Sequence, residues 1–217
     1  LSVFSDASQG FNDYEFSADE SNLLLTTETE GIYRHSFYAN YYTHDLESKT
    51  TRPLSDFALG KQRLAAFSPD AKQVAFVRDN NVFIVDLVSE VESQVTTDGE
   101  RNKIINGATD WVYEEEFGKD NGIFWSPDGK FLAFYRFDES AVKEFSMPMY
   151  GQLYPEPYTF KYPKAGEDNA AVNVFVYNTN TGKTLSVLNS KTEYIPRVKW
   201  GVNNEQLVLM TMNRHQS

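Results

Sequence analysis

The sequence predicts an all-β chain made of β-propeller blades, each with four antiparallel strands. A turn motif recurs along the chain, short apolar strands follow each copy, and the 3.6-residue apolar period of helical repeats is absent. Repeats of about 40 to 50 residues with four short strands are typical of propeller blades. We expect about four blades, which is an incomplete propeller, because closed propellers with blades of this length use more.

The recurring motif is an aromatic residue, a Ser or Gly, and a polar turn. Its copies are Phe16-Ser17-Ala18-Asp19, Phe67-Ser68-Pro69-Asp70, Trp125-Ser126-Pro127-Asp128-Gly129 and the weaker Trp200-Gly201-Val202-Asn203. Proline presets φ at the first corner of such a turn and glycine accepts positive φ at the other, so each copy predicts a hairpin. We expect the leading aromatic residue of every copy in the core.

Further apolar segments predict the third strand of each blade, with fourth strands after them. These segments are Tyr41–Leu46, Val82–Leu87 and Val174–Thr179. The interval of about 138–171 contains four prolines and is expected to be an inserted loop between two strands of one blade. Because an arc of blades leaves unpaired strand edges, we expect the chain to be part of a larger protein.

Composition excludes several classes of function. With 20 Lys and Arg against 31 Asp and Glu, the net charge of −11 argues against nucleic acid as a partner. No cysteine is present, so a disulfide, a thiolate metal site and a cysteine nucleophile are excluded. His35, His44 and His215 lack metal-ligand spacing, and we expect neither a metal nor a cofactor. No apolar run approaches the roughly 20 residues of a membrane-spanning helix.

One acidic segment departs from the blade pattern: Asp110-Trp111-Val112-Tyr113-Glu114-Glu115-Glu116. Thr109 and Asp110 suit a helix N-cap, so we expect a short helix that leaves the blade. Adjacent carboxylates repel one another unless a cation lies between them, and that cation can be a metal, a basic side chain or the α-ammonium group of a peptide. The residues alone also allow a solvated acidic turn.

This segment, followed by Trp125-Ser126-Pro127, resembles the double-glutamate motif of the dipeptidyl peptidase IV family. Other similar stretches are Asn12-Asp13-Tyr14, Tyr33-Arg34-His35-Ser36-Phe37 and Tyr162-Pro163-Lys164-Ala165-Gly166. The resemblance runs along nearly the whole chain. It implies a short helix that projects from the propeller into a cavity facing a hydrolase domain. There Glu115 and Glu116 hold the free amino terminus of the substrate, and Glu114 is a supporting or structural residue.

The resemblance also implies that residues 1–217 form a partial N-terminal propeller domain, with the α/β-hydrolase catalytic domain outside this chain. No Gly-x-Ser-x-Gly nucleophile elbow occurs in the sequence, so we expect no catalytic residue here and no activity from this fragment alone. Family members use a propeller arginine near the substrate. The loop matched to it, roughly residues 54–62, contains no arginine, and neither Arg52 nor Arg63 can be assigned to that place.

The function implied is that of a serine exopeptidase that releases Xaa-Pro or Xaa-Ala dipeptides. Its expected partners are peptides with a free N-terminus, the hydrolase domain of the same parent chain and a second copy in a homodimer. We expect it outside the cytoplasm, in a bacterial periplasm or cell envelope. The alternative is a non-catalytic periplasmic propeller that binds a protein partner. A prolyl oligopeptidase-type endopeptidase is disfavoured, because cutting inside chains needs no amine-binding site.

Overall fold

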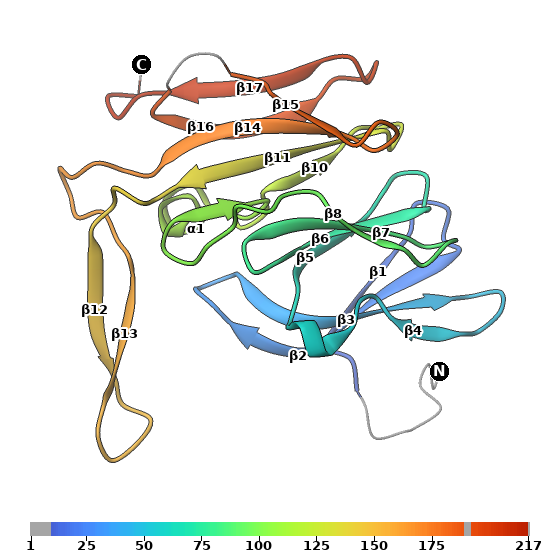
Figure 1. The fold of residues 1–217 in the computed structure, drawn as a ribbon, viewed down its shortest axis with the longest axis horizontal. Coiled ribbons are helices and arrows are strands. Elements are labelled where there is room, and N and C mark those ends of the chain that lie inside the picture. Colours follow the sequence, from blue (N-terminus) through green and yellow to red (C-terminus); the bar gives the residue numbers. More distant parts are fainter. Residues whose placement is uncertain (1–9, 189–191, 217) are drawn as a thin grey trace.

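The computed structural model describes residues 10–188 and 192–216. Antiparallel sheets follow one another along the chain and lie side by side, from the first at the bottom of Figure 1 to the last at the top. The first sheet contains β1 (Asp13–Phe16), β2 (Asn22–Gly31), β3 (Phe37–Asp45) and β4 (Thr51–Pro53). After a short 3-10 helix, Phe57–Leu59, the second contains β5 (Arg63–Phe67), β6 (Gln73–Arg78), β7 (Asn81–Asp86) and β8 (Glu92–Gln94).

The third sheet repeats this order and adds one short strand. It contains β10 (Ile123–Trp125), β11 (Phe131–Asp138), β14 (Ala171–Asn178) and β15 (Lys183–Ser186), and β9 (Ile104–Asn106) also pairs with β11. The fourth sheet contains β16 (Tyr194–Trp200) and β17 (Leu207–Met212) within the described residues. The prediction of an all-β chain with four-stranded antiparallel sheets is therefore confirmed.

Side chains close the turn between the first two strands of each of the first three sheets. The Ser68 hydroxyl donates to Asp70 Oδ1 at 2.7 Å and accepts the Gln73 N–H at 2.9 Å. The same bonds recur at the turns that contain Ser17 with Asp19 and Ser126 with Asp128. With the turn held in this way, Glu20 and Ala71 adopt the positive φ (57° and 59°) that glycine was expected to supply.

The second and third sheets, and likewise the third and fourth, are joined through the first strand of each. The Trp125 indole N–H donates to the Ala66 carbonyl of the second sheet at 3.2 Å, and the Trp200 indole N–H donates to the Phe124 carbonyl of the third at 2.9 Å. Phe16 holds the same place in the repeat but is 49% exposed, so its assignment to the core is wrong. The reason is that no sheet precedes the first one within the described residues.

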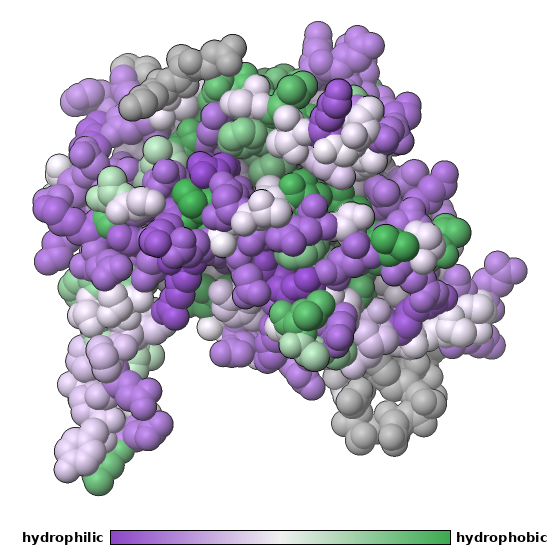
Figure 2. All heavy atoms as spheres, viewed as in Figure 1, coloured by the Kyte–Doolittle hydropathy of each residue, from purple (hydrophilic) through white to green (hydrophobic). Residues whose placement is uncertain are grey.

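The interval between β11 and β14 forms a regular hairpin instead of the expected loop. It contains β12 (Glu144–Met149) and β13 (Glu156–Lys161), and we call residues 144–161 the arm. Figure 1 shows the arm extending away from the sheets, and Figure 2 shows it standing clear of the rest of the surface. Its exposed apolar side chains are Phe145, Met147, Met149, Tyr150, Leu153 and Tyr154.

Candidate functional site

The acidic segment forms a short helix, α1 (Trp111–Phe117), between β9 and β10. The residues just before and just after α1 are joined to one another: Ala108 forms a β-bridge with Asn121, and the Thr109 hydroxyl donates to the Lys119 carbonyl at 2.7 Å. A Cβ atom on Gly122 would lie 2.7 Å from the backbone of Gly107, so only glycine allows the chain to enter and leave at this point. The third sheet therefore holds α1 in a defined place.

Both ends of α1 carry caps. Asp110 Oδ1 accepts the Tyr113 N–H at 3.0 Å, which confirms the N-cap prediction. Gly118 ends the helix in the left-handed conformation at φ 60°, and its N–H donates to the Tyr113 carbonyl. Burial raises the pKa of Asp110 to about 6, and hydrogen bonds from backbone N–H groups offset only part of that effect.

The three glutamates of α1 lie in different environments. Glu114 is 1% exposed and belongs to the first turn of the helix. Glu115 is partly buried, Glu116 is exposed, and both come near the C-terminal end, where the helix dipole disfavours negative charge and no basic residue lies in the last turn. The helix dipole therefore favours the negative charge of Glu114 but not that of Glu115 or Glu116. A cation from outside the helix would stabilise the other two carboxylates.

Arg34 supplies one such cation from the turn between β2 and β3. Its Nε lies 3.1 Å from Glu115 Oε2, and its side chain is 72% exposed. The Glu116 carboxylate makes no hydrogen bond or ion pair with any residue in the described ranges. Glu115, Glu116 and Arg34 together carry a net charge of about −1. That balance favours the binding of another cation from solution.

Arg34 lies outside residues 54–62, the loop in which the resemblance placed the arginine near the substrate. The available signal was the similar stretch Tyr33–Phe37, which contains Arg34. The two arginines considered instead have other surroundings: Arg52 forms an ion pair with Glu90, and Arg63 is 5% exposed in β5.

Tyr162, the residue after the arm, lies against α1. Its ring meets the Trp111 ring edge to face, with the ring centroids 4.5 Å apart. A cavity of about 470 Å³ lies between the base of the arm and the first three sheets and contains no residue of α1. Its lining includes Tyr33, Arg63, Thr109, Glu139 and Phe160. Burial, and then the charge of Asp110, raise the pKa of Glu139 to about 7. Residues from the first three sheets and the arm thus line this cavity.

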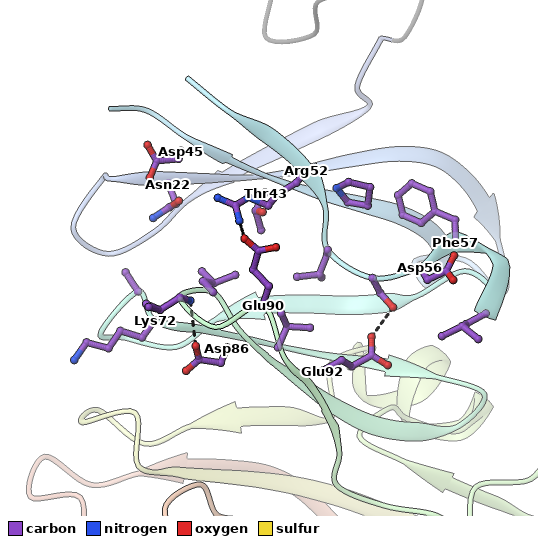
Figure 3. Close-up of a pocket in the computed structure, with 18 residues that line it drawn as sticks. Asn22, Thr43, Asp45, Arg52, Asp56, Phe57, Lys72, Asp86, Glu90 and Glu92 are labelled. Carbon is purple, nitrogen blue, oxygen red and sulfur yellow. Dashed lines mark hydrogen bonds and ion pairs between the residues drawn. The ribbon is translucent and has the colours of Figure 1, made fainter. Parts of the chain in front are cut away.

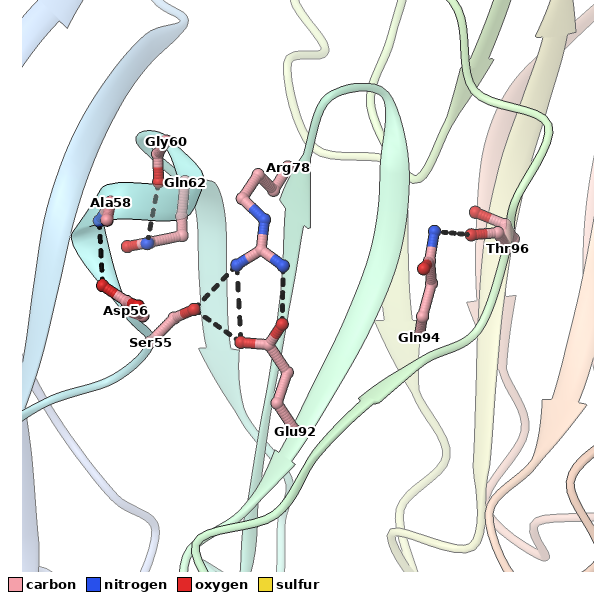
Figure 4. Close-up of polar contacts among 9 residues, drawn as sticks. All are labelled: Ser55, Asp56, Ala58, Gly60, Gln62, Arg78, Glu92, Gln94 and Thr96. Carbon is pink, nitrogen blue, oxygen red and sulfur yellow. Dashed lines mark hydrogen bonds and ion pairs between the residues drawn. The ribbon is translucent and has the colours of Figure 1, made fainter.

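Another cavity, of about 750 Å³, lies between the first and second sheets (Figure 3) and contains no residue of α1. The ion pair of Arg52 with Glu90 crosses it. On its border, Arg78 pairs with Glu92 at 2.6 Å and donates to the Ser55 hydroxyl at 2.7 Å (Figure 4). These contacts join the two sheets, and we assign them a structural role.

Neither a metal site nor a membrane-spanning helix is found in the described part of the chain. Within residues 10–188 and 192–216, no three His, Asp or Glu side chains are grouped so that they could hold a metal ion. None of the helices described is long and apolar enough to cross a membrane.

Comparisons with known proteins agree on one family. The family model described as the dipeptidyl peptidase IV (DPP IV) N-terminal region matches residues 17–217. Dipeptidyl aminopeptidase B of Saccharomyces cerevisiae is 34% identical over 205 residues, which are 90% of this chain and 25% of the relative. The crystal structure of Porphyromonas gingivalis dipeptidyl peptidase 4 is 49% identical with a TM-score of 0.91, over 97% of this chain and 30% of that protein. The chain thus spans about a quarter to a third of the length of these two proteins.

Proposed function

Since this chain belongs to the dipeptidyl peptidase IV family and matches its N-terminal region, we propose that it is the propeller part of a serine exopeptidase. The complete protein would release Xaa-Pro or Xaa-Ala dipeptides from the N-terminus of peptides. Glu115 and Glu116 would bind the α-ammonium group of the substrate. The observation that supports this most is the acidic C-terminal end of α1, where Arg34 pairs with only one of the two carboxylates.

The proposed role of the two glutamates is to position the substrate. If the ammonium group is held at a set distance from a nucleophile in the hydrolase domain, only two residues fit before the scissile bond. A carboxylate that accepts a hydrogen bond from an ammonium group contributes about 1.5–3 kcal/mol, which is about 10- to 150-fold in kcat/KM. The bond-breaking groups would belong to the hydrolase domain.

The proposed partners are peptides with a free N-terminus, the hydrolase domain of the same parent chain and a second copy in a homodimer. The protein acts outside the cytoplasm, in a bacterial periplasm or cell envelope, which the identity to a bacterial relative supports. Light scattering on the complete protein measures its mass in solution, and a monomeric mass would contradict the homodimer.

The test compares single variants of the complete protein on two substrates. Glu115→Gln and Glu116→Gln should each lower kcat/KM for a Gly-Pro amide at least about 10-fold. For an N-acetylated substrate, kcat/KM should already be low with the unchanged protein, and neither substitution should lower it much further. Glu47→Gln, at an exposed position in the turn after β3, is the matched control. Unchanged kinetics at both Glu115 and Glu116 would contradict the amine-binding role. A complete protein without any activity on the Gly-Pro amide would instead favour the non-catalytic propeller.

A further inference from the structure

Glu114 connects α1 to the turn between β2 and β3. Its Oε1 accepts the N–H of His35 at 2.8 Å and the N–H of Ser36 at 2.9 Å. The turn is closed by the Ile32 N–H, which donates to the Ser36 carbonyl at 2.9 Å. Because Glu114 is only 1% exposed, these charge-assisted hydrogen bonds are shielded from water.

The same turn carries Arg34, the partner of Glu115. Neighbouring glutamates of α1 therefore contact neighbouring residues of one turn, Glu114 through backbone N–H groups and Glu115 through the guanidinium. An exposed ion pair contributes little by itself, because holding two long side chains costs entropy and water screens the charges. The buried contact is thus the stronger one, and it sets the distance between the turn and the helix.

A buried cation lies near the Glu114 carboxylate. Arg63 of β5 is 5% exposed. Its Nε and Nη2 atoms are buried and have no hydrogen-bond partner within the described residues, and the same holds for Glu114 Oε2. Burial lowers the pKa of Arg63, and the negative charge of Glu114 is among the influences that oppose this shift. The attraction between these opposite charges favours a carboxylate at position 114 over a neutral side chain of the same size.

We propose that Glu114 is a positioning residue for the amine-binding site. By holding residues 32–36 against α1, it places the Arg34 guanidinium beside Glu115 and so orients the carboxylate that would meet the substrate. This inference rests on the proposed function of Glu115 and Glu116. Glu114 itself is too deeply buried to touch a peptide, so it acts through Arg34.

The experiment is a double-mutant cycle in the complete protein with a Gly-Pro amide as substrate. Glu114→Gln keeps the size of the side chain but removes its charge, and it should raise KM about 10-fold with kcat changed less than about twofold. In an Arg34→Met background the same substitution should change KM less than about twofold, because the residue through which it acts is gone. Glu47→Gln serves as the exposed control.

A second variant covers the case in which Glu114→Gln does not fold. Glu114→Asp keeps the charge beside Arg63 but shortens the reach to the turn, and it should also raise KM. Folded Glu114 variants with unchanged KM, or equal effects of Glu114→Gln in both backgrounds, would overturn the inference. A Glu115→Gln variant without effect would instead overturn the proposed function, so the two failures are distinguishable.

Discussion

The Tyr113 hydroxyl accepts the N–H of Ile195 at 2.7 Å, and the Tyr135 hydroxyl donates to the carbonyl of the same residue at 2.6 Å. These bonds connect α1 and β11 to β16 across the interface between the third and fourth sheets. Ile195 is fully buried, so its peptide group depends on both tyrosines for hydrogen bonds. Helix α1 is therefore held from the first sheet through Glu114 and from the fourth through Tyr113.

We predict that Tyr113→Phe destabilises the chain by about 1–3 kcal/mol, because it leaves the Ile195 N–H buried without a partner. Urea unfolding, followed by tryptophan fluorescence, measures the change. Tyr150→Phe, at a position 80% exposed in the arm, is the matched control and should change the free energy of unfolding by less than about 0.5 kcal/mol. Equal effects at the two positions would contradict a role for the Tyr113 hydroxyl.

Removal of Arg78 should weaken the contact between the first and second sheets. Its guanidinium bonds to Glu92 and Ser55 and lies 4.2 Å from the centroid of the Phe83 ring. Because its side chain is only 7% exposed, Arg78→Met leaves the bonded oxygens partly buried and should cost about 2 kcal/mol of stability. Arg52→Met breaks an exposed ion pair with Glu90 and should cost less than about 1 kcal/mol. The midpoints of urea unfolding measure the loss of stability in each variant. Similar losses for Arg78→Met and Arg52→Met would contradict the difference expected between the buried and the exposed ion pair.

Stability should depend on pH through Glu139. Its folded-state pKa of about 7 exceeds the ordinary value of 4.5, so the native state binds the proton more tightly than the unfolded state. The contribution that protonated Glu139 makes to the free energy of unfolding is fully present below about pH 4.5 and is lost as pH rises through about 7. Glu139→Gln should therefore gain stability relative to the unchanged chain over that interval, by up to about 3 kcal/mol. Urea unfolding of both proteins at several pH values tests this. A difference in the free energy of unfolding that does not change with pH would contradict it.

The chain by itself should show no peptidase activity. The sequence contains no Gly-x-Ser-x-Gly elbow, and no nucleophile, base and oxyanion hole can be assembled from its residues. A purified sample should release no chromophore from a Gly-Pro amide, whereas the complete protein should do so. A serine-hydrolase inhibitor controls for contaminating enzymes. Activity of the chain that persists in the presence of this inhibitor would refute the prediction.

The sequence alone determined the elements whose chemistry is local. Each hairpin could be predicted because alternating apolar residues and the Ser-x-Asp turn lie within a few residues of one another. The start of α1 was predictable for the same reason, since Asp110 bonds to Tyr113 within one turn of helix. The acidic segment also pointed to the family to which the chain belongs.

The tertiary structure alone decided which distant residues meet. Arg34 reaches Glu115, and Glu114 binds the backbone of His35 and Ser36, only because the first and third sheets place β3 and α1 side by side. The exposure of Phe16 likewise depends on which sheet precedes its own. Contacts of this kind follow from how the sheets pack, which no pattern within a single strand or turn records.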